Sequence, residues 1–155
     1  MELHLLRHAK TKQAVFGERD FDRQLLPKGL RQLDDLQKHL PDMDLVNVHC
    51  SSSKRTRQSF ELLAASRKFK SVCFQDELYL ASGRELLAYL NEQGGSEPIL
   101  LIGHNNGISD LAEMLTESYQ AMKTCAYLCL DVPLDSWEML SSGTATIRRS
   151  YRPEV

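Results

Sequence analysis

The stretch Leu3-His4-Leu5-Leu6-Arg7-His8-Ala9-Lys10 combines an apolar run with an arginine-histidine pair that follows it. The apolar run predicts a buried β-strand over residues 2–7. In an open α/β sheet, residues at the carboxyl end of a strand face the crevice where ligands bind. Arginine offers a fixed fork of donors suited to phosphate, and histidine acts near neutral pH as a nucleophile or a proton carrier. The stretch therefore predicts a first strand that delivers Arg7 and His8 to a ligand site.

Length and composition favour one domain covering residues 1–155. Hydrophobic residues make up 42% of the chain and charged residues 26%, and the net charge of −2 speaks against general nucleic-acid binding. The sequence has no apolar run long enough to span a membrane, and Arg7 and His8 interrupt any signal-peptide pattern. We therefore expect a cytoplasmic protein without a membrane partner. The four cysteines form no CxxC motif, which predicts reduced, small apolar residues.

Strand and helix patterns alternate along the chain up to residue 117. This alternation predicts an α/β fold, a three-layer sandwich whose mostly parallel central sheet carries helices on both faces. The tail predicts antiparallel strands joined by short turns. Predicted strands cover residues 2–7, 45–49, 72–74, 98–102, 126–132, 136–140 and 144–151, and predicted helices cover 27–40, 54–66, 83–93 and 108–115.

Polar residues follow three of the predicted parallel strands. The first strand is followed by Arg7 and His8, the second by a serine-rich segment with Arg55, and the fourth by a loop with His104. Because the carboxyl ends of parallel strands share one edge of a sheet, two arginines and two histidines are expected to converge there. Two arginines can hold the oxygens of a phosphoryl group, one neutral histidine can attack phosphorus, and a second, charged histidine can hold an oxygen. Such chemistry requires no metal and no cofactor.

Four segments resemble, in the same order, the signature motifs of the histidine phosphatase superfamily, which has the phosphoglycerate mutase-like fold. Leu6-Arg7-His8-Ala9 is similar to its RHG/RHA motif, and Asp22-Arg23-Gln24-Leu25-Leu26-Pro27-Lys28-Gly29 is similar to its D-RPLTxxG entry into the first helix. Ser51-Ser52-Ser53-Lys54-Arg55-Thr56-Arg57-Gln58-Ser59 resembles SSPxxRTxQT, and Gly103-His104-Asn105-Asn106-Gly107 resembles GHNPG. Each match is weak alone, whereas four matches together are specific.

The resemblance implies roles for the residues that match these motifs. His8 would be the nucleophile that forms a transient phosphohistidine. Arg7, Arg55 and His104 would grip the phosphoryl group, and we expect Asn105 to contribute to phosphate binding. The resemblance also implies a catalytic site without metal.

The sequence departs from the family pattern in three places. Ser52 and Asn106 stand where the family usually has proline, which costs loop rigidity but removes no phosphate ligand. Many members carry a catalytic acid in a stretch like ELxExxxG, and in the matching residues 76–83 that position is Leu80. This departure and the short chain resemble the small SixA branch, the protein phosphohistidine phosphatases. Glu77 is the remaining candidate for the acid.

A site without an acid favours phosphohistidine as substrate. An ester alkoxide leaves badly without a proton, whereas the P–N bond to imidazole is already labile. We therefore expect a metal-independent phosphatase that acts through His8 on a phosphorylated protein, such as a phosphotransfer domain. Two alternatives stay open, namely a small-molecule phosphomonoesterase that uses Glu77 or water as its acid, and a non-catalytic phosphoryl-binding module. The other histidines, His4, His39 and His49, are expected to be structural.

Overall fold

The structure of the protein is a computed structural model that describes residues 1–154. Strands and helices alternate as the sequence predicted, and short 3-10 helices (η) lie in three of the connections. In chain order the elements are β1 (Glu2–Arg7), η1 (Asp20–Asp22), α1 (Pro27–Gln37), β2 (Asn47–Ser51), α2 (Lys54–Ala64), β3 (Ser71–Gln75), η2 (Asp76–Leu78), α3 (Gly83–Asn91), β4 (Ile99–Gly103), α4 (Gly107–Thr116), β5 (Tyr127–Asp131), η3 (Trp137–Met139) and β6 (Thr146–Tyr151).

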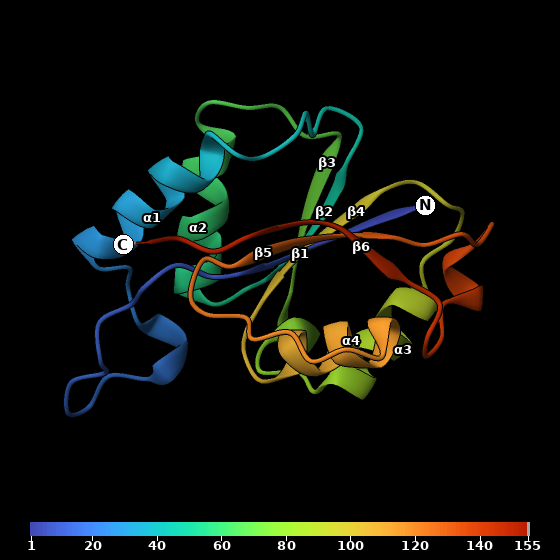
Figure 1. Ribbon diagram of the computed structural model, residues 1–155. Helices are drawn as coiled ribbons and strands as arrows, with labels where there is room; N and C mark the ends of the chain where they lie inside the picture. The colour runs from blue at the N-terminus through green and yellow to red at the C-terminus, as the bar shows by residue number, and fades with distance from the viewer. Residues whose placement is uncertain (155) are drawn as a thin grey trace.

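One six-stranded sheet in the order β3-β2-β4-β1-β5-β6 forms the middle of the molecule (Figure 1). Strands β1 to β4 pair in parallel, whereas β5 and β6 add an antiparallel edge. Helices α1 and α2 lie on one face of the sheet and α3 and α4 on the other (Figure 1). The predicted three-layer α/β fold is confirmed.

The alternation of side chains along β1 divides the core between the two faces. Leu3 and Leu5 pack with the apolar residues of α3 and α4, whereas Leu6 packs with those of α1 and α2. All three leucines are buried, because helices cover the central strand on both sides. The strand is therefore held firmly up to Arg7, where the predicted site begins.

The predicted strand at residues 136–140 is wrong. The segment instead forms the short helix η3, in which Trp137 is buried and its indole nitrogen donates to the carbonyl oxygen of Glu97 at 2.9 Å. The side-chain amide of Asn91 donates to the carbonyl oxygens of Trp137 and Leu140, both at 2.9 Å. Those carbonyl groups are thus satisfied by α3, and the segment closes over the end of that helix.

The second strand begins two residues later than predicted and ends at Ser51. Val46 forms a turn with Met43, and Leu45 is 73% exposed, so the apolar pair before the strand does not belong to it. Ser51 pairs with Gln75 in β3 as the last residue of the ladder. The shift matters because it fixes Ser51, expected in a loop, at the end of a buried strand.

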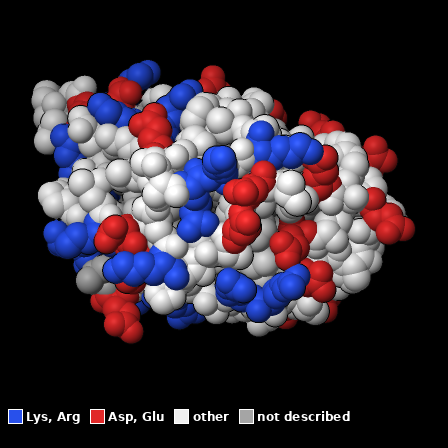
Figure 2. All heavy atoms as spheres, turned by 90° about the horizontal axis from the view of Figure 1, so that it is seen from above, with Lys and Arg blue, Asp and Glu red and all other residues white. Residues whose placement is uncertain are grey.

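Charged side chains of both signs lie on the face of the molecule seen from above in Figure 2. Figure 2 shows Lys and Arg interspersed with Asp and Glu on the face seen from above, as expected for a net charge of −2. Within residues 1–154, no helix is both long and apolar enough to cross a bilayer.

Candidate active site

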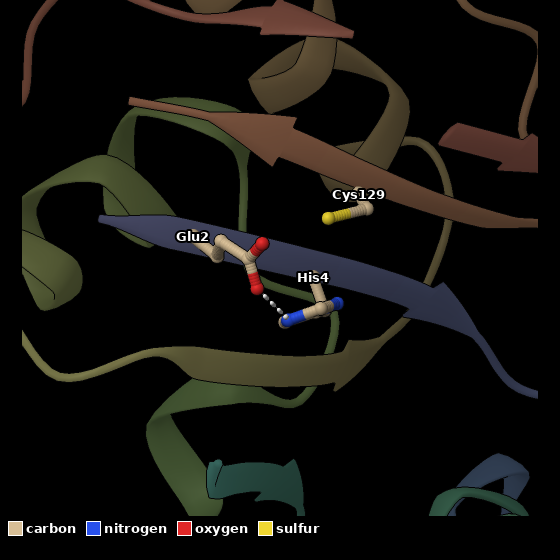
Figure 3. Close-up of side chains that lie close together, drawn as sticks. All are labelled: Glu2, His4 and Cys129. Atoms are coloured by element: carbon tan, nitrogen blue, oxygen red, sulfur yellow. Dashed lines mark ion pairs between the residues drawn. The ribbon is translucent and has the colours of Figure 1, made fainter. Parts of the chain in front are cut away.

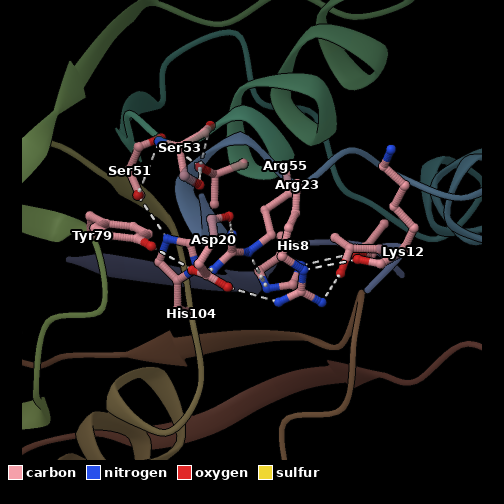
Figure 4. A network of polar contacts seen from close by, with 12 residues as sticks. His8, Lys12, Asp20, Arg23, Ser51, Ser53, Arg55, Tyr79 and His104 are labelled. Carbon is pink, nitrogen blue, oxygen red and sulfur yellow. Dashed lines mark hydrogen bonds and ion pairs between the residues drawn. The ribbon is translucent and has the colours of Figure 1, made fainter. Parts of the chain in front are cut away.

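The carboxyl ends of three parallel strands bring the predicted site residues into one hollow (Figure 4). Arg7 ends β1 and His8 follows it, His104 follows β4, and Arg55 lies in the first turn of α2 after β2. Parallel pairing of β1 and β2 with β4 puts these strand ends on the same edge of the sheet. The hollow has a volume of about 280 Å³ and is lined by Arg7, His8, Lys10, Thr11, Gln13, Asp20, Arg23, Arg55, Leu80, His104, Asn105 and Thr124.

The hydrogen bonds of His8 define which of its ring nitrogens carries the proton. Its Nδ1 lies 2.8 Å from the carbonyl oxygen of Ala9, which can only accept, so Nδ1 carries the proton. Nε2 is then unprotonated and accepts from Nε of Arg55 at 3.3 Å. Burial, with the nearby charges of Arg55 and Arg7, lowers the pKa of His8 to about 3. At neutral pH the ring is therefore a neutral base whose lone pair faces Arg55.

His104 lies beside His8, with a distance of 5.3 Å between the ring centroids. Its Nε2 is 2.7 Å from the hydroxyl of Ser51, and its Nδ1 is buried without a hydrogen-bond partner among the described residues. Burial first, then the proximity of His8 and Arg55, lowers the pKa of His104 to about 2. Without a ligand His104 is thus neutral. A bound dianion would raise the pKa of His104 and so favour the uptake of the proton that makes the ring a cation.

The two arginines are held in different ways. Arg7 donates from Nη1 to the carbonyl oxygen of Met122 at 3.0 Å, and its buried Nε has no hydrogen-bond partner among the described residues. Arg55 donates from Nη1 to the backbone oxygen of Asp20 at 2.7 Å and from Nη2 to the Asp20 carboxylate at 3.0 Å. A phosphoryl group could therefore meet an unused donor on Arg7, but on Arg55 it would have to replace Asp20.

Asp20 is a residue of this site for which no sequence pattern predicted a role. Its carboxylate accepts hydrogen bonds from Arg55, from Arg23 at 2.9 Å and from the hydroxyl of Tyr79 (Figure 4). Burial alone would raise the pKa of Asp20, but the bonds from Tyr79, Arg23 and Arg55 outweigh it and hold the pKa well below its usual range. The residue lies between β1 and α1 in the charged run Glu18-Arg19-Asp20, which is no specific sign of a binding site.

Arg23 ties the same segment to the hollow. Its guanidinium donates to the carbonyl oxygen of Lys12 at 2.8 Å and to the hydroxyl of Thr11 at 2.7 Å, in addition to Asp20. The motif that resembles D-RPLTxxG includes Arg23, so the resemblance marked the position without indicating this function. Arg23 fixes the loop that carries Asp20 over Arg55.

Some of the other predicted residues line the hollow, and others lie outside it. Asn105 lines it, and so do Lys10, for which no role was predicted, and Leu80, which stands where many family members have an acid. Glu77 is exposed and lines a separate hollow with residues of α3. His49, whose Nδ1 lies 2.6 Å from the hydroxyl of Tyr89, also lies outside the hollow, as expected of a structural histidine.

Comparisons with known proteins agree with this fold. The family model for the histidine phosphatase superfamily (branch 1) matches residues 3–79. The solved structure named phosphohistidine phosphatase SixA from Nakamurella multipartitia is 27% identical, with a TM-score of 0.79 over 99% of this chain and 96% of that one. The corresponding SixA structure from Agrobacterium tumefaciens is 22% identical, with a TM-score of 0.77 over 98% of this chain and 97% of that one.

A third structure, of the protein histidine phosphatase SixA complexed with tungstate, shares the fold at 19% identity, with a TM-score of 0.74 over 97% of this chain and 96% of that one. No curated protein matches the chain significantly. The family match and the SixA structure from Nakamurella multipartitia, which is 27% identical, together support a phosphatase. By its motifs, its fold and the family match, the chain belongs to the histidine phosphatase superfamily.

Proposed function

We propose that this phosphatase hydrolyses phosphohistidine in a protein and that His8 is its nucleophile. The observation that carries the proposal is the unprotonated Nε2 of His8, which faces Arg55 in a buried, polar hollow. A neutral imidazole is the nucleophilic form of histidine, and the low pKa of His8 keeps it in that form at neutral pH. The hydrogen bond to Ala9 fixes the tautomer that leaves Nε2 available.

The phosphoryl oxygens would be held by Arg7, Arg55 and His104, with Asn105 at the rim. The unused Nε of Arg7 and the unused Nδ1 of His104 supply donors once a dianion draws a proton onto His104. On Arg55 the phosphoryl group replaces the carboxylate of Asp20, which has the same charge sign and accepts from Nη2. Such donors stabilise the charge that spreads over the equatorial oxygens during transfer.

The reaction would proceed in two displacements. Nε2 of His8 attacks phosphorus, the P–N bond of the substrate breaks, and its electron pair stays on the substrate imidazole, which takes a proton from water. A water molecule then attacks phosphorus and breaks the bond to Nε2, so that inorganic phosphate leaves and His8 is regenerated. The water supplies one proton to the solvent and its oxygen to the phosphate.

The lack of a protonated carboxyl group among the described residues of the hollow favours a P–N substrate over an ester. Asp20 is the only carboxyl group among the described residues that line the hollow, and its low pKa keeps it ionised. Leu80 occupies the family's acid position, and Glu77 lies outside the hollow. Loss of general-acid catalysis lowers ester hydrolysis by about 10²–10⁴-fold, whereas an imidazole leaving group depends less on it.

Phosphate release tests the proposal, with a phosphohistidine-bearing phosphotransfer domain and a panel of phosphate monoesters as parallel substrates. We expect rapid release from phosphohistidine only, abolished in His8→Ala and retained in His39→Ala, which removes an exposed histidine outside the hollow. Efficient turnover of monoesters would instead favour the phosphomonoesterase alternative. Release from neither substrate by the wild type would favour the phosphoryl-binding module.

A further inference from the structure

Three potential metal ligands gather on β1 and β5, at the end of β1 opposite to His8. Glu2 and His4 are two residues apart on β1, so their side chains point to the same face of the sheet. Cys129 stands directly opposite His4 in the antiparallel register of β5. Figure 3 shows the three side chains converging, and their ligand atoms all lie within 4.8 Å of one another.

His4 is oriented as a metal-ligating histidine requires. The residue is 1% exposed, and its Nε2 is buried without a hydrogen-bond partner among the described residues, 3.4 Å from Oε1 of Glu2. Its Nδ1 lies 2.7 Å from the hydroxyl of Tyr127, which also belongs to β5. With a metal on Nε2, a hydrogen bond donated from Nδ1 to this hydroxyl would fix the ring, as outer-sphere partners of ligating histidines do.

We propose that Glu2, His4 and Cys129 bind a divalent transition-metal ion, Zn²⁺ in the first place. Carboxylate oxygen, imidazole nitrogen and thiolate sulfur are the three donor types that Zn²⁺ accepts. Tetrahedral bonds of about 2.0–2.3 Å separate the ligand atoms by roughly 3.5 Å, so a side-chain movement of about an ångström closes the site. Water supplies the fourth ligand through the half-exposed side of Glu2.

The charges balance when the ion binds. Binding releases the thiol proton of Cys129 to solvent, and the resulting thiolate and the Glu2 carboxylate together neutralise the ion. Two positive groups face the cluster from β6: Arg148 donates to Oε2 of Glu2 at 2.6 Å, and Arg149 pairs with Cys129 in the register. Arg148 leaves Oε1, the oxygen beside His4, for the metal. The ion would tie β1 to β5 without contact with the hollow.

Cobalt and zinc titrations of the chelator-treated full chain test this site. Co²⁺ is expected to give a thiolate-to-cobalt charge-transfer band at one equivalent, which Zn²⁺ then abolishes, and Zn²⁺ is expected to raise the Tm. Both signals should vanish in Cys129→Ser. They should persist in Cys73→Ser, which removes the thiol of the chain's other close cysteine–histidine pair, 3.2 Å from Nδ1 of His49.

A second variant keeps the test valid if Cys129→Ser folds poorly. Glu2→Gln changes a half-exposed residue at the start of β1 and should weaken Zn²⁺ binding at least tenfold, with an unchanged Tm in the presence of chelator. The absence of both the cobalt band and the Zn²⁺-dependent Tm rise in the wild type would overturn the proposal. A band that disappears in Cys73→Ser instead would also overturn it, because the metal would then lie at His49.

Discussion

At Arg55, a carboxylate already occupies the donors that the proposed reaction needs. Asp20 accepts from this guanidinium through its side chain and its backbone oxygen, and Arg23 and Tyr79 hold the same carboxylate in place. The arrangement satisfies a buried arginine that would otherwise lack a counter-charge. In the proposed reaction this contact must be given up when a phosphoryl group binds, so we expect Asp20 to lower the affinity of the hollow for anions.

Asp20→Asn is therefore expected to tighten the binding of inorganic phosphate by about tenfold, which corresponds to roughly 1.4 kcal/mol. The substitution removes a negative charge that competes for Arg55 while keeping a side chain of the same size. Isothermal titration of phosphate into both proteins measures the change. Asp22→Asn is the matched control, because Asp22 forms its ion pair with Arg19 on the surface and not with Arg55. Unchanged or weaker phosphate binding in Asp20→Asn would show that the carboxylate supports the anion site instead of competing for it.

Leu80 offers a direct test of the argument from the missing acid. This residue lines the hollow and is 55% exposed, so a longer polar side chain fits there without entering the core. Leu80→Glu is expected to raise the turnover of phosphate monoesters by at least about tenfold, because a carboxylic acid can protonate the leaving alkoxide. Turnover of phosphohistidine should change much less. Steady-state rates on both substrates measure the effect, with Leu80→Gln as the control that cannot donate a carboxyl proton. Equal rates for the two variants would contradict the argument.

At the scale of the element, the position of α4 depends on a close approach at its first residue. A Cβ on Gly107 would lie 1.9 Å from the carbonyl oxygen of Ala81, a backbone atom that cannot yield without moving the segment before α3. Gly107→Ala is therefore expected to destabilise the fold by about 2 kcal/mol or more and to disturb the adjacent loop of His104. Urea unfolding measures the loss. Gly94→Ala is the control, because its Cβ would meet nothing within 4 Å, and an equal loss in both variants would refute the steric explanation.

The elements also show what could be predicted from the sequence. The continuous apolar runs of β1 and β4 and the helical spacing between them predicted the parallel sheet, because burial on both faces leaves a strong pattern. The strand predicted at residues 136–140 was wrong, because Trp137 is held by long-range hydrogen bonds that no local pattern reveals. The role of Asp20 could not be predicted for the same reason, because its partners Arg55 and Tyr79 lie 35 and 59 residues away along the chain. The motif residues could be predicted because they lie at strand ends or shortly after them, where a local pattern marks them.

At the scale of the whole molecule, the buried neutral histidines make stability depend on pH. The pKa values of His8 and His104 fall to about 3 and about 2 in the folded protein, against an ordinary value of 6.5 in the unfolded chain. Between those values the unfolded state binds more protons than the folded state, so the free energy of unfolding decreases as the pH falls below about 6.5. Each histidine contributes a slope that approaches about 1.4 kcal/mol per pH unit.

Urea unfolding between pH 7 and pH 5 reports on the buried histidines, because most carboxyl groups stay ionised over that range. Burial also lowers the pKa values of His4 and His49, and these two residues add to the slope in the wild type and in the variants alike. We expect the wild type to lose stability steadily across it, and the double variant His8→Asn/His104→Asn to show a flatter dependence, whatever its stability at pH 7. His39→Asn should keep the wild-type slope, since His39 is exposed and stacks on Tyr151 outside the hollow. Parallel curves for the wild type and the double variant would mean that both rings already accept protons in the folded state. In that case His8 would lack the neutral, nucleophilic form on which the proposed reaction depends.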